Sequence, residues 1–336
     1  MTIAVTSAIA SAPGKVVIAG EYAVLHGAPA ISMAVDRRSR VTVSPGSEST
    51  SSLETLGYRD GRRWFRQSGG AVDWLENASP GGGLELFEAV LAETHCKASG
   101  PMDYLIDSSA FADRDTGLKY GFGSSAAVAV ALTAACLGPG DNRISTLAGR
   151  AHRRFQQGSG SGIDIATSVH GGVIRFQRGA EVEAMSWPQG LEARILWSGA
   201  SASTGEKIRG LGTEDASEVA RKLADAAQNV CDCWKAGDPS AVLSALADFV
   251  DRLADFDASK ARGIFEAGHA ELVQEARAFN DLVYKPCGAG GGDVGMAFST
   301  SARSLAAFCA AAELRGICPL DVALDPVGVR CEGTKA

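Results

Sequence analysis

The sequence predicts a mixed α+β protein with two lobes. Its 336 residues exceed the size at which a single hydrophobic core is usual. Residues 1–45 are rich in β-forming segments, whereas residues 212–282 show mainly the spacing of amphipathic helices. We place the boundary in the region where this character changes, which gives an N-terminal lobe over residues 1–190 and a C-terminal lobe over residues 191–336.

The N-terminal lobe is expected to begin with strands and to continue with helices. The segment "RSRVTVS" (38–44) alternates polar and apolar residues as a half-buried strand does, and residues 83–96 carry apolar residues at helical spacing. Serine, glycine and proline predict turns or loops at 44–52 and 77–83. In chain order we expect strands within 2–10, 15–20 and 38–44, a helix over 83–96, a strand over 101–107, helices from about 125 and over 144–156, and a turn, helix and strand across 161–177.

The C-terminal lobe is expected to be richer in helices. A glycine-rich turn that starts at residue 285 runs into a strand that ends near residue 298. A helix over 301–316 follows, and Gly316 is a suitable residue to close it, because glycine adopts the left-handed conformation common at helix C-termini. The segment "PLDVALD" (319–325) predicts a final strand.

Composition excludes several classes of protein. Hydrophobic residues make up 46% of the chain and charged residues 21%, the net charge is −7, and no run of Lys and Arg exceeds two residues, so a nucleic-acid partner is not expected. The eight cysteines contain no C-x-x-C pair, which argues against a zinc or thioredoxin-like site. We see no signal peptide and no run of about 20 apolar residues, so we expect a cytoplasmic protein without membrane contact, either a monomer or a homodimer.

Three glycine-rich segments carry the unusual chemistry: "SAPGKVVIAGEYAVLHGAPA" (11–30), "GLKYGFGSSAAVAV" (117–130) and "KPCGAGGGDVGMAF" (285–298). None matches the Walker A pattern or a dinucleotide fingerprint. The turn at 121–125 is either a structural helix cap or an anion site formed by free amides at a helix N-terminus. The four glycines between 288 and 292 form either a flexible loop or a backbone that something approaches closely.

In order and spacing, these segments resemble the three signature motifs of the GHMP kinases. The parts that carry the resemblance are "APGKVVIAGEYAVLHG", "GFGSSAAVAV" and "KPCGAGGGDVG", which span nearly the whole chain. The resemblance implies a two-lobed α+β fold, with an N-terminal lobe of the ribosomal protein S5 domain 2-like type and a ferredoxin-like C-terminal lobe. It also implies that ATP and Mg²⁺ are used and that the anion interpretation of the 121–125 turn is the correct one.

Within this superfamily, several details look like the phosphomevalonate kinase family. Asp293 closes "GAGGGD", where mevalonate kinases usually carry another glycine. The segments "GSGSGIDIATSVHGG" (158–172) and "WSGASAST" (197–204) are similar to two further stretches of that family. A glutamate that mevalonate kinases carry eleven residues before Asp164 is replaced by Arg153. The resemblance therefore implies phosphorylation of 5-phosphomevalonate to 5-diphosphomevalonate.

The resemblance also implies roles for individual residues. Lys15 would contact the reacting phosphates, and Asp164 would be the catalytic carboxylate beside it. A serine hydroxyl would reach Mg²⁺; Ser124 and Ser125 are both candidates, and we take Ser125 as the metal ligand. The nucleotide phosphates would meet Gly121, Gly123, Ser124, Ser125 and Ala126. The acceptor would meet Glu21, His26, Ser161, Gly162, Ser203, Gly288, Ala289, Gly290 and Gly291.

Structural alternatives remain for most of these residues. Lys15 could be a solvated surface lysine, Asp164 could cap the following helix, and His26 could be a turn residue. The "HRR" triplet at 152–154 would either face the acceptor phosphate together with Lys15 or form a solvated helix face. The alternatives for the whole protein are a mevalonate kinase, a sugar kinase or a catalytically silent binding protein of the same fold.

Overall fold

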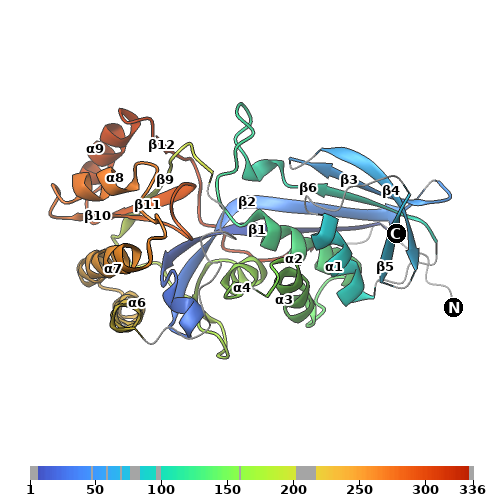
Figure 1. The fold of residues 1–336 in the computed structure, drawn as a ribbon, viewed down its shortest axis with the longest axis horizontal. Helices are drawn as coiled ribbons and strands as arrows, with labels where there is room; N and C mark the ends of the chain where they lie inside the picture. Colours follow the sequence, from blue (N-terminus) through green and yellow to red (C-terminus); the bar gives the residue numbers. More distant parts are fainter. Residues whose placement is uncertain are drawn as a thin grey trace.

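The computed structural model describes residues 7–46, 48–57, 60–68, 70–75, 84–95, 100–158, 160–201 and 217–332. Two β-sheets lie side by side along the longest axis of the molecule (Figure 1), the larger one built mostly from residues 8–185 and the smaller one from residues 192–319. The mixed α+β class and the two-lobed arrangement are therefore confirmed. The expected loop at 77–83 lies outside the described residues.

The larger sheet is mixed, because one of its strand pairs, β3–β6, is parallel and the others are antiparallel. Its strand order is β13-β1-β2-β6-β3-β4-β5, with β7 also paired to β2 and β8 paired to β7. The strands are β1 (Ala8–Ala19), β2 (Ala30–Pro45), β3 (Ser51–Leu56), β4 (Gly61–Ser68), β5 (Ala71–Trp74), β6 (Met102–Asp107), β7 (Val173–Phe176), β8 (Glu183–Met185) and β13 (Arg330–Glu332).

Four helices cover one face of this sheet (Figure 1). They are α1 (Leu84–Thr94), α2 (Ser124–Leu137), α3 (Ile144–Phe155) and α4 (Ile163–His170), and two 3-10 turns, η1 (Ala23–His26) and η2 (Ser109–Phe111), complete the lobe. α2 packs on β1 and β2 and also touches α1, α3 and α4. The almost wholly apolar sequence of α2 follows from this central place.

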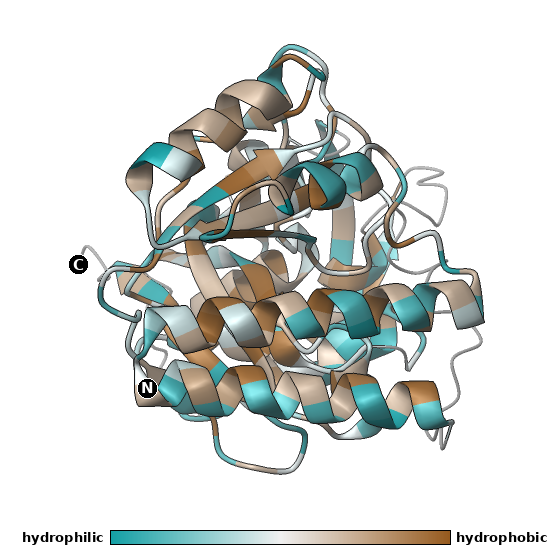
Figure 2. Cartoon of the chain, turned by 90° about the vertical axis from the view of Figure 1, so that its left-hand side faces the viewer, coloured by the Kyte–Doolittle hydropathy of each residue, from teal (hydrophilic) through white to brown (hydrophobic). Residues whose placement is uncertain are grey.

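The smaller sheet is antiparallel throughout, in the order β10-β11-β9-β12. Its strands are β9 (Glu192–Trp197), β10 (Leu282–Pro286), β11 (Val294–Ser299) and β12 (Cys318–Pro319). The accompanying helices are α6 (Glu218–Ala236), α7 (Pro239–Lys260), α8 (His269–Ala276) and α9 (Ala302–Glu313). α6 and α7 run side by side with alternating apolar and hydrophilic surface (Figure 2), and Ser217 and Asp238 cap their N-termini.

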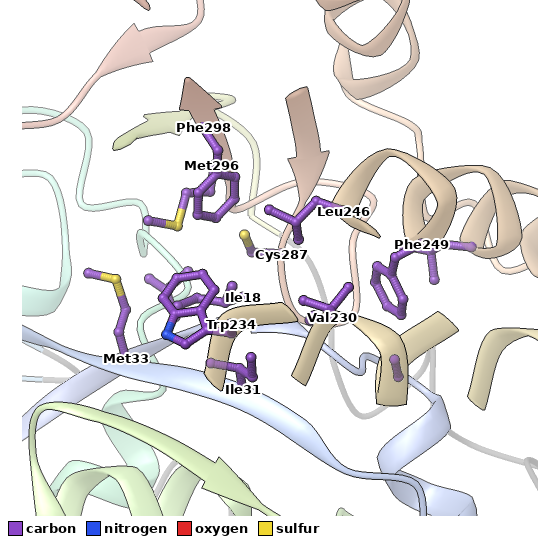
Figure 3. Close-up of a cluster of buried hydrophobic side chains, with 14 of the residues drawn as sticks. Ile18, Ile31, Met33, Val230, Trp234, Leu246, Phe249, Cys287, Met296 and Phe298 are labelled. Carbon is purple, nitrogen blue, oxygen red and sulfur yellow. The ribbon is translucent and has the colours of Figure 1, made fainter. Parts of the chain in front are cut away.

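One hydrophobic core joins the two sheets. Figure 3 draws Ile18, Ile31 and Met33 of the larger sheet close to Trp234 of α6. The same cluster contains Val230, Leu246, Phe249, Cys287, Met296 and Phe298. Because each large apolar side chain buried here contributes about 1.5–3 kcal/mol, this shared core fixes one lobe against the other. Chain segments far apart in sequence therefore meet in a defined geometry.

The structure corrects two expectations about elements and confirms a third. The loop predicted over residues 44–52 is shorter in the structure, because β2 extends to Pro45 and β3 begins at Ser51. The predicted strand over 319–325 is wrong: beyond β12, only Leu324 forms an isolated bridge, to Val35 of β2. Gly316 does close α9, at φ 77°, where its amide donates to the Glu313 carbonyl.

The division of the lobes at residues 190 and 191 remains our proposal. β9 starts the smaller sheet at Glu192, but the last strand, β13, pairs with β1 of the larger sheet. The end of the chain thus ties the lobes together. Among the described helices, none is both long and apolar enough to cross a membrane.

Candidate active site

A cavity of about 390 Å³ lies where the three glycine-rich segments meet. The first segment lines it with Lys15 and Glu21, the second with the 121–125 turn, and the third with Gly288 and Ala289. The N-terminus of α4 adds Ser161, Gly162 and Asp164. Segments far apart in the sequence therefore converge on one concave site.

Lys15 is held at the centre of this site by backbone contacts. A register shift in β1 falls at Gly14, and the Lys15 amide donates to the Phe122 carbonyl at 2.9 Å. A Cβ atom at Gly14 would lie 2.7 Å from that same carbonyl oxygen, so glycine is required for the approach. Lys15 is only 9% exposed, and its Nζ atom lies 3.1 Å from Oδ1 of Asp164. The alternative of a solvated surface lysine is excluded.

Asp164 sits in the first turn of α4 but does not cap the helix. The N-cap position is Gly162, at φ 94°, and no side chain caps the helix there. The Ser161 hydroxyl instead accepts a hydrogen bond from the Ile163 amide at 3.2 Å. The capping role considered for Asp164 is therefore wrong, and its carboxylate serves the ion pair with Lys15. Both charges line the cavity.

The turn before α2 has the geometry of an anion site. Gly121 and Gly123 have φ values of 91° and 71°, which residues with side chains rarely adopt. A Cβ atom at Gly121 would collide with Asp293, and one at Gly123 would press on the Lys15 side chain. Ser124 and Ser125 begin α2 and line the cavity, and their amides find no backbone acceptor among the described residues. Free amides and the helix dipole both favour an anion here.

Ala126 does not take part in this turn as predicted. Its amide donates to the Gly123 carbonyl at 3.1 Å, and the residue is fully buried. It does not line the cavity. The helix begins at Ser124, so Ala126 already belongs to its first turn. The amide of Ala126 therefore donates its hydrogen bond within the first helical turn and is not free to bind an anion.

His152 faces the cavity, whereas the next two residues of the "HRR" triplet do not. The Nε2 atom of His152 lies 2.9 Å from the Ser125 hydroxyl, a contact that the sequence did not predict. Burial lowers the pKa of His152, and Lys15 lowers it further against the opposite influence of Asp164. A neutral imidazole is therefore favoured at pH 7. Arg153 and Arg154 are exposed and line no part of the cavity, so the triplet does not supply cations there.

Only part of the third glycine segment faces the cavity. Gly288 and Ala289 line it, but Gly290 and Gly291 do not. The Gly291 amide donates to the Ile264 carbonyl at 2.8 Å, and a Cβ atom at Gly290 would lie 2.4 Å from the same oxygen. The close approach predicted for these glycines is real, but the neighbour is the segment after α7 rather than a ligand. Their assignment to acceptor binding stays a prediction, and these backbone contacts do not support it.

Glu21 and His26 are separated by the structure. Glu21 lines the cavity, is 4% exposed and forms a buried ion pair with Lys285 at 2.5 Å. His26 lies outside the cavity at the end of η1, followed by Gly27 at φ 89°, so it is a turn residue. Ser203 lies outside the described residues.

Sequence reasoning missed two further parts of the cavity. Lys119 lines it beside the 121–125 turn, and burial lowers the pKa of this lysine. The other part is an apolar end formed by strands of the larger sheet and by the helices that cover it. It is lined by Leu53, Leu86, Ile106, Val128 and Phe155. These side chains are ordinary apolar residues of helices and strands, and no motif marks them as ligand contacts.

Comparison with known proteins identifies the family. A family model described as the GHMP kinases N terminal domain matches residues 85–172. A phosphomevalonate kinase from Streptomyces sp. (strain CL190) is 30% identical over 351 residues, which cover 88% of this chain and 91% of that protein. The chain belongs to the GHMP kinases. The family that the three glycine-rich segments resemble is thereby confirmed.

Further relatives of this GHMP kinase differ in the acceptor that they are named for. A mevalonate kinase from Methanothermobacter thermautotrophicus is 35% identical over 174 residues, 49% of this chain and 48% of that protein. A structure of Streptococcus pneumoniae phosphomevalonate kinase in complex with phosphomevalonate and AMPPNP superposes with a TM-score of 0.76 at 16% identity, covering 94% of this chain and 99% of that one. The two-lobed GHMP kinase fold is confirmed.

Proposed function

We propose that this GHMP kinase transfers the γ-phosphoryl group of ATP to 5-phosphomevalonate and forms 5-diphosphomevalonate. The observation that carries the proposal is the Lys15–Asp164 ion pair, at 3.1 Å, in a cavity that also contains the N-terminus of α2. Phosphoryl transfer depends on positioning and on charge neutralisation, and this arrangement provides both. The similarity to a phosphomevalonate kinase over most of both chains supports this acceptor.

The two ends of the cavity suggest how ATP is bound. The apolar end has the character of a site for a flat base, while the amides of Ser124 and Ser125 would hold the phosphates. Gly123 would let the phosphates approach the backbone, because no Cβ atom stands in the way. In this arrangement the γ-phosphate lies nearest to Lys15.

The oxygen atoms near the α2 N-terminus fit a magnesium ion. The hydroxyl of Ser125 and the carboxylate of Asp164 line the same cavity, and Mg²⁺ typically takes only one or two protein oxygens together with substrate phosphates. Ser125 would hold the ion, with Ser124 as the alternative. When bound, the ion would neutralise charge on the β- and γ-phosphates. Among the described residues, no three acidic, histidine or cysteine side chains converge on a metal site.

The protein's own residues would then divide the work as follows. Lys15 would stabilise negative charge on the transferring phosphoryl group, and Asp164 would hold the ammonium of Lys15 in place. A phosphate monoester has its second pKa near 6 and is mostly ionised at neutral pH. Asp164 would therefore orient Lys15 without having to remove a proton from the acceptor. The acceptor would lie against four further residues of the cavity wall: Ser161, Gly162, Gly288 and Ala289.

A mevalonate kinase is the second candidate. The carboxylate of Asp164 lies within the cavity and could serve as a base for a hydroxyl acceptor. The 35% identical mevalonate kinase relative favours this reading as well. A sugar kinase and a silent binding protein have no comparable support. A cytoplasmic location and a monomeric or homodimeric state remain predictions.

A coupled ADP-release assay with three acceptors tests the proposal. Purified protein with ATP and Mg²⁺ is given 5-phosphomevalonate, mevalonate or galactose. We expect turnover with 5-phosphomevalonate at a kcat/KM at least 100-fold above that with either other acceptor. Preferred turnover of mevalonate would establish the second candidate instead, and turnover with none would contradict both.

A further inference from the structure

A buried lysine of the C-terminal lobe supports the cavity residue Glu21. Lys285, in β10, has no exposed surface, and its ammonium donates to Oε1 of Glu21 at 2.5 Å. It also donates to the carbonyls of Pro286 at 2.8 Å and Val17 at 3.5 Å. All three N–H donors therefore have acceptors, and the charge is balanced by one carboxylate. A buried ion pair with this many partners fixes both side chains.

The next residue of the first segment makes a second contact with the third segment. The Tyr22 hydroxyl donates to the Ala289 carbonyl at 2.7 Å. Tyr22 adopts φ 61° and ψ −47°, an unusual backbone conformation for a residue with a side chain. Such a conformation persists only where its surroundings impose it, and it occurs mainly at functional sites. Glu21 and Tyr22 thus join the lobes on both sides of Cys287 and Gly288.

The second carboxylate oxygen of Glu21 lacks a partner. Oε2 is buried and has no hydrogen-bond partner among the described residues, although Glu21 lines the cavity. A buried charged acceptor without a donor costs free energy, and the cost is larger than for a neutral group. A donor from a bound ligand would remove this cost. The partner must be a group that carries a hydrogen, because a phosphate or carboxylate there would face repulsion from Glu21.

We propose that Lys285 is a positioning residue, which holds Glu21 so that its free carboxylate oxygen accepts a hydrogen bond from a hydroxyl group of the acceptor. This inference rests on the proposed function. In 5-phosphomevalonate, the phosphate and the carboxylate are largely ionised at neutral pH, and the tertiary hydroxyl is the remaining polar group and the one that donates. The part of the cavity beside Glu21 therefore selects for that hydroxyl, whereas Lys15 and the N-terminus of α2 bind the phosphates.

The test compares 5-phosphomevalonate with an analogue in which hydrogen replaces the tertiary hydroxyl. Hydrogen bonds to charged groups contribute about 1.5–3 kcal/mol, so the wild-type kcat/KM should fall about 10- to 150-fold with the analogue. The ratio of the two kcat/KM values is the readout, because a merely structural defect lowers kcat/KM equally for both acceptors. KM for ATP is measured in parallel and should not differ between the two acceptors.

Two variants and one control complete the experiment. In Lys285→Met the ratio should shrink at least threefold, because Glu21 is no longer held in place. The double variant with Glu21→Met and Lys285→Met removes both charges at similar volume, and its ratio should come within threefold of one even if the single variant does not fold. Lys235→Met removes an exposed lysine that pairs with Glu183 at 2.6 Å, and it should keep the wild-type ratio.

The outcomes separate this inference from the proposed function. Efficient phosphorylation of 5-phosphomevalonate, with a wild-type ratio near one, would overturn the inference and leave the proposed function intact. A wild-type ratio that persists in the double variant would also overturn it, since another group would then recognise the hydroxyl. No turnover of 5-phosphomevalonate would overturn the proposed function and the inference together.

Discussion

Replacing Lys15 with methionine is the most informative single perturbation of the proposed site. Methionine retains much of the apolar stem that passes Gly123 and removes the ammonium that pairs with Asp164. Two unit charges about 4 Å apart interact by about 4 kcal/mol at an effective dielectric constant near 20. Because each ~1.4 kcal/mol of barrier changes the rate tenfold, kcat should fall about 10²- to 10³-fold.

Stability should change far less than activity. The Asp164 side chain is 27% exposed, so water can solvate the carboxylate after its partner is lost. We expect the free energy of unfolding to fall by about 1 kcal/mol, near the lower end for a hydrogen bond to a charged group that is left unmade. Lys15 is only 9% exposed, so methionine, which fills much of the same space, leaves a smaller cavity than a shorter side chain would.

The assay pairs steady-state ADP release with urea unfolding for Lys15→Met and for Lys235→Met. The control removes an equally charged lysine from an exposed ion pair outside the cavity, and it should keep wild-type kcat. A folded Lys15→Met protein with kcat within threefold of the control would refute the role of Lys15. A loss confined to the KM of the acceptor would assign Lys15 to binding and not to the transition state.

Three further predictions follow from the same geometry. Wild-type kcat/KM should rise from pH 5.5 to 7 as the acceptor phosphate ionises, and Asp164→Asn should keep that rise; a pH–rate profile of the variant that lacks it would assign the rise to Asp164 and favour mevalonate kinase. Gly290→Val should lower stability by more than 2 kcal/mol and abolish activity, because its Cβ would meet the Ile264 carbonyl at 2.4 Å; unchanged urea unfolding would contradict the packing. Burial raises the pKa of Cys287 to about 11, so above pH 9 the unfolded chain loses a proton that the folded chain keeps. The free energy of unfolding should therefore fall by up to about 1.4 kcal/mol per pH unit between pH 9 and 11. The Cys287→Ala variant should show a correspondingly shallower decline.

The parts of the fold that the sequence predicted are those set by local patterns. α1, α2, α3 and α9 lie close to their predicted ranges, because helical spacing and the Gly316 C-terminus are local signals. The hairpins formed by β3, β4 and β5 were not predicted, since the segment 44–52, with five serines, one proline and one glycine, predicts a loop. β3 pairs with its neighbour β4 and also with β6, a partner about 50 residues away that no local pattern reveals.

The site shows the same division. Lys15, Asp164 and the 121–125 turn were predicted because each lies in a motif of recognisable composition, and the structure brings them together. Lys285 could not be predicted, because its burial makes sense only with Glu21, which lies 264 residues away. The contact between Ser125 and His152 likewise depends on the packing of α2 against α3.

Which amides of the turn before α2 stay free is set by the hydrogen bonds of the first helical turn, where the Ala126 amide donates to the Gly123 carbonyl. Whether a glycine faces a ligand or another part of the chain is also not encoded locally. Gly290 and Gly291 look the same in the sequence as Gly288, yet the segment after α7 occupies the space beside them. A glycine motif predicts that another group lies close to the backbone, and tertiary packing decides whether that group is a ligand or another segment of the chain.

The chemical identity of the product tests the central claim most directly. The protein is incubated with ATP, Mg²⁺ and 5-phosphomevalonate, and the reaction is followed by ³¹P NMR beside a Lys15→Met sample at equal concentration. The account predicts that the monoester resonance is replaced by two coupled resonances of a diphosphate ester, in step with ADP, and that this conversion is at least 100-fold slower in the variant. A persistent monoester signal in the wild type, or a diphosphate formed equally fast by Lys15→Met, would contradict it.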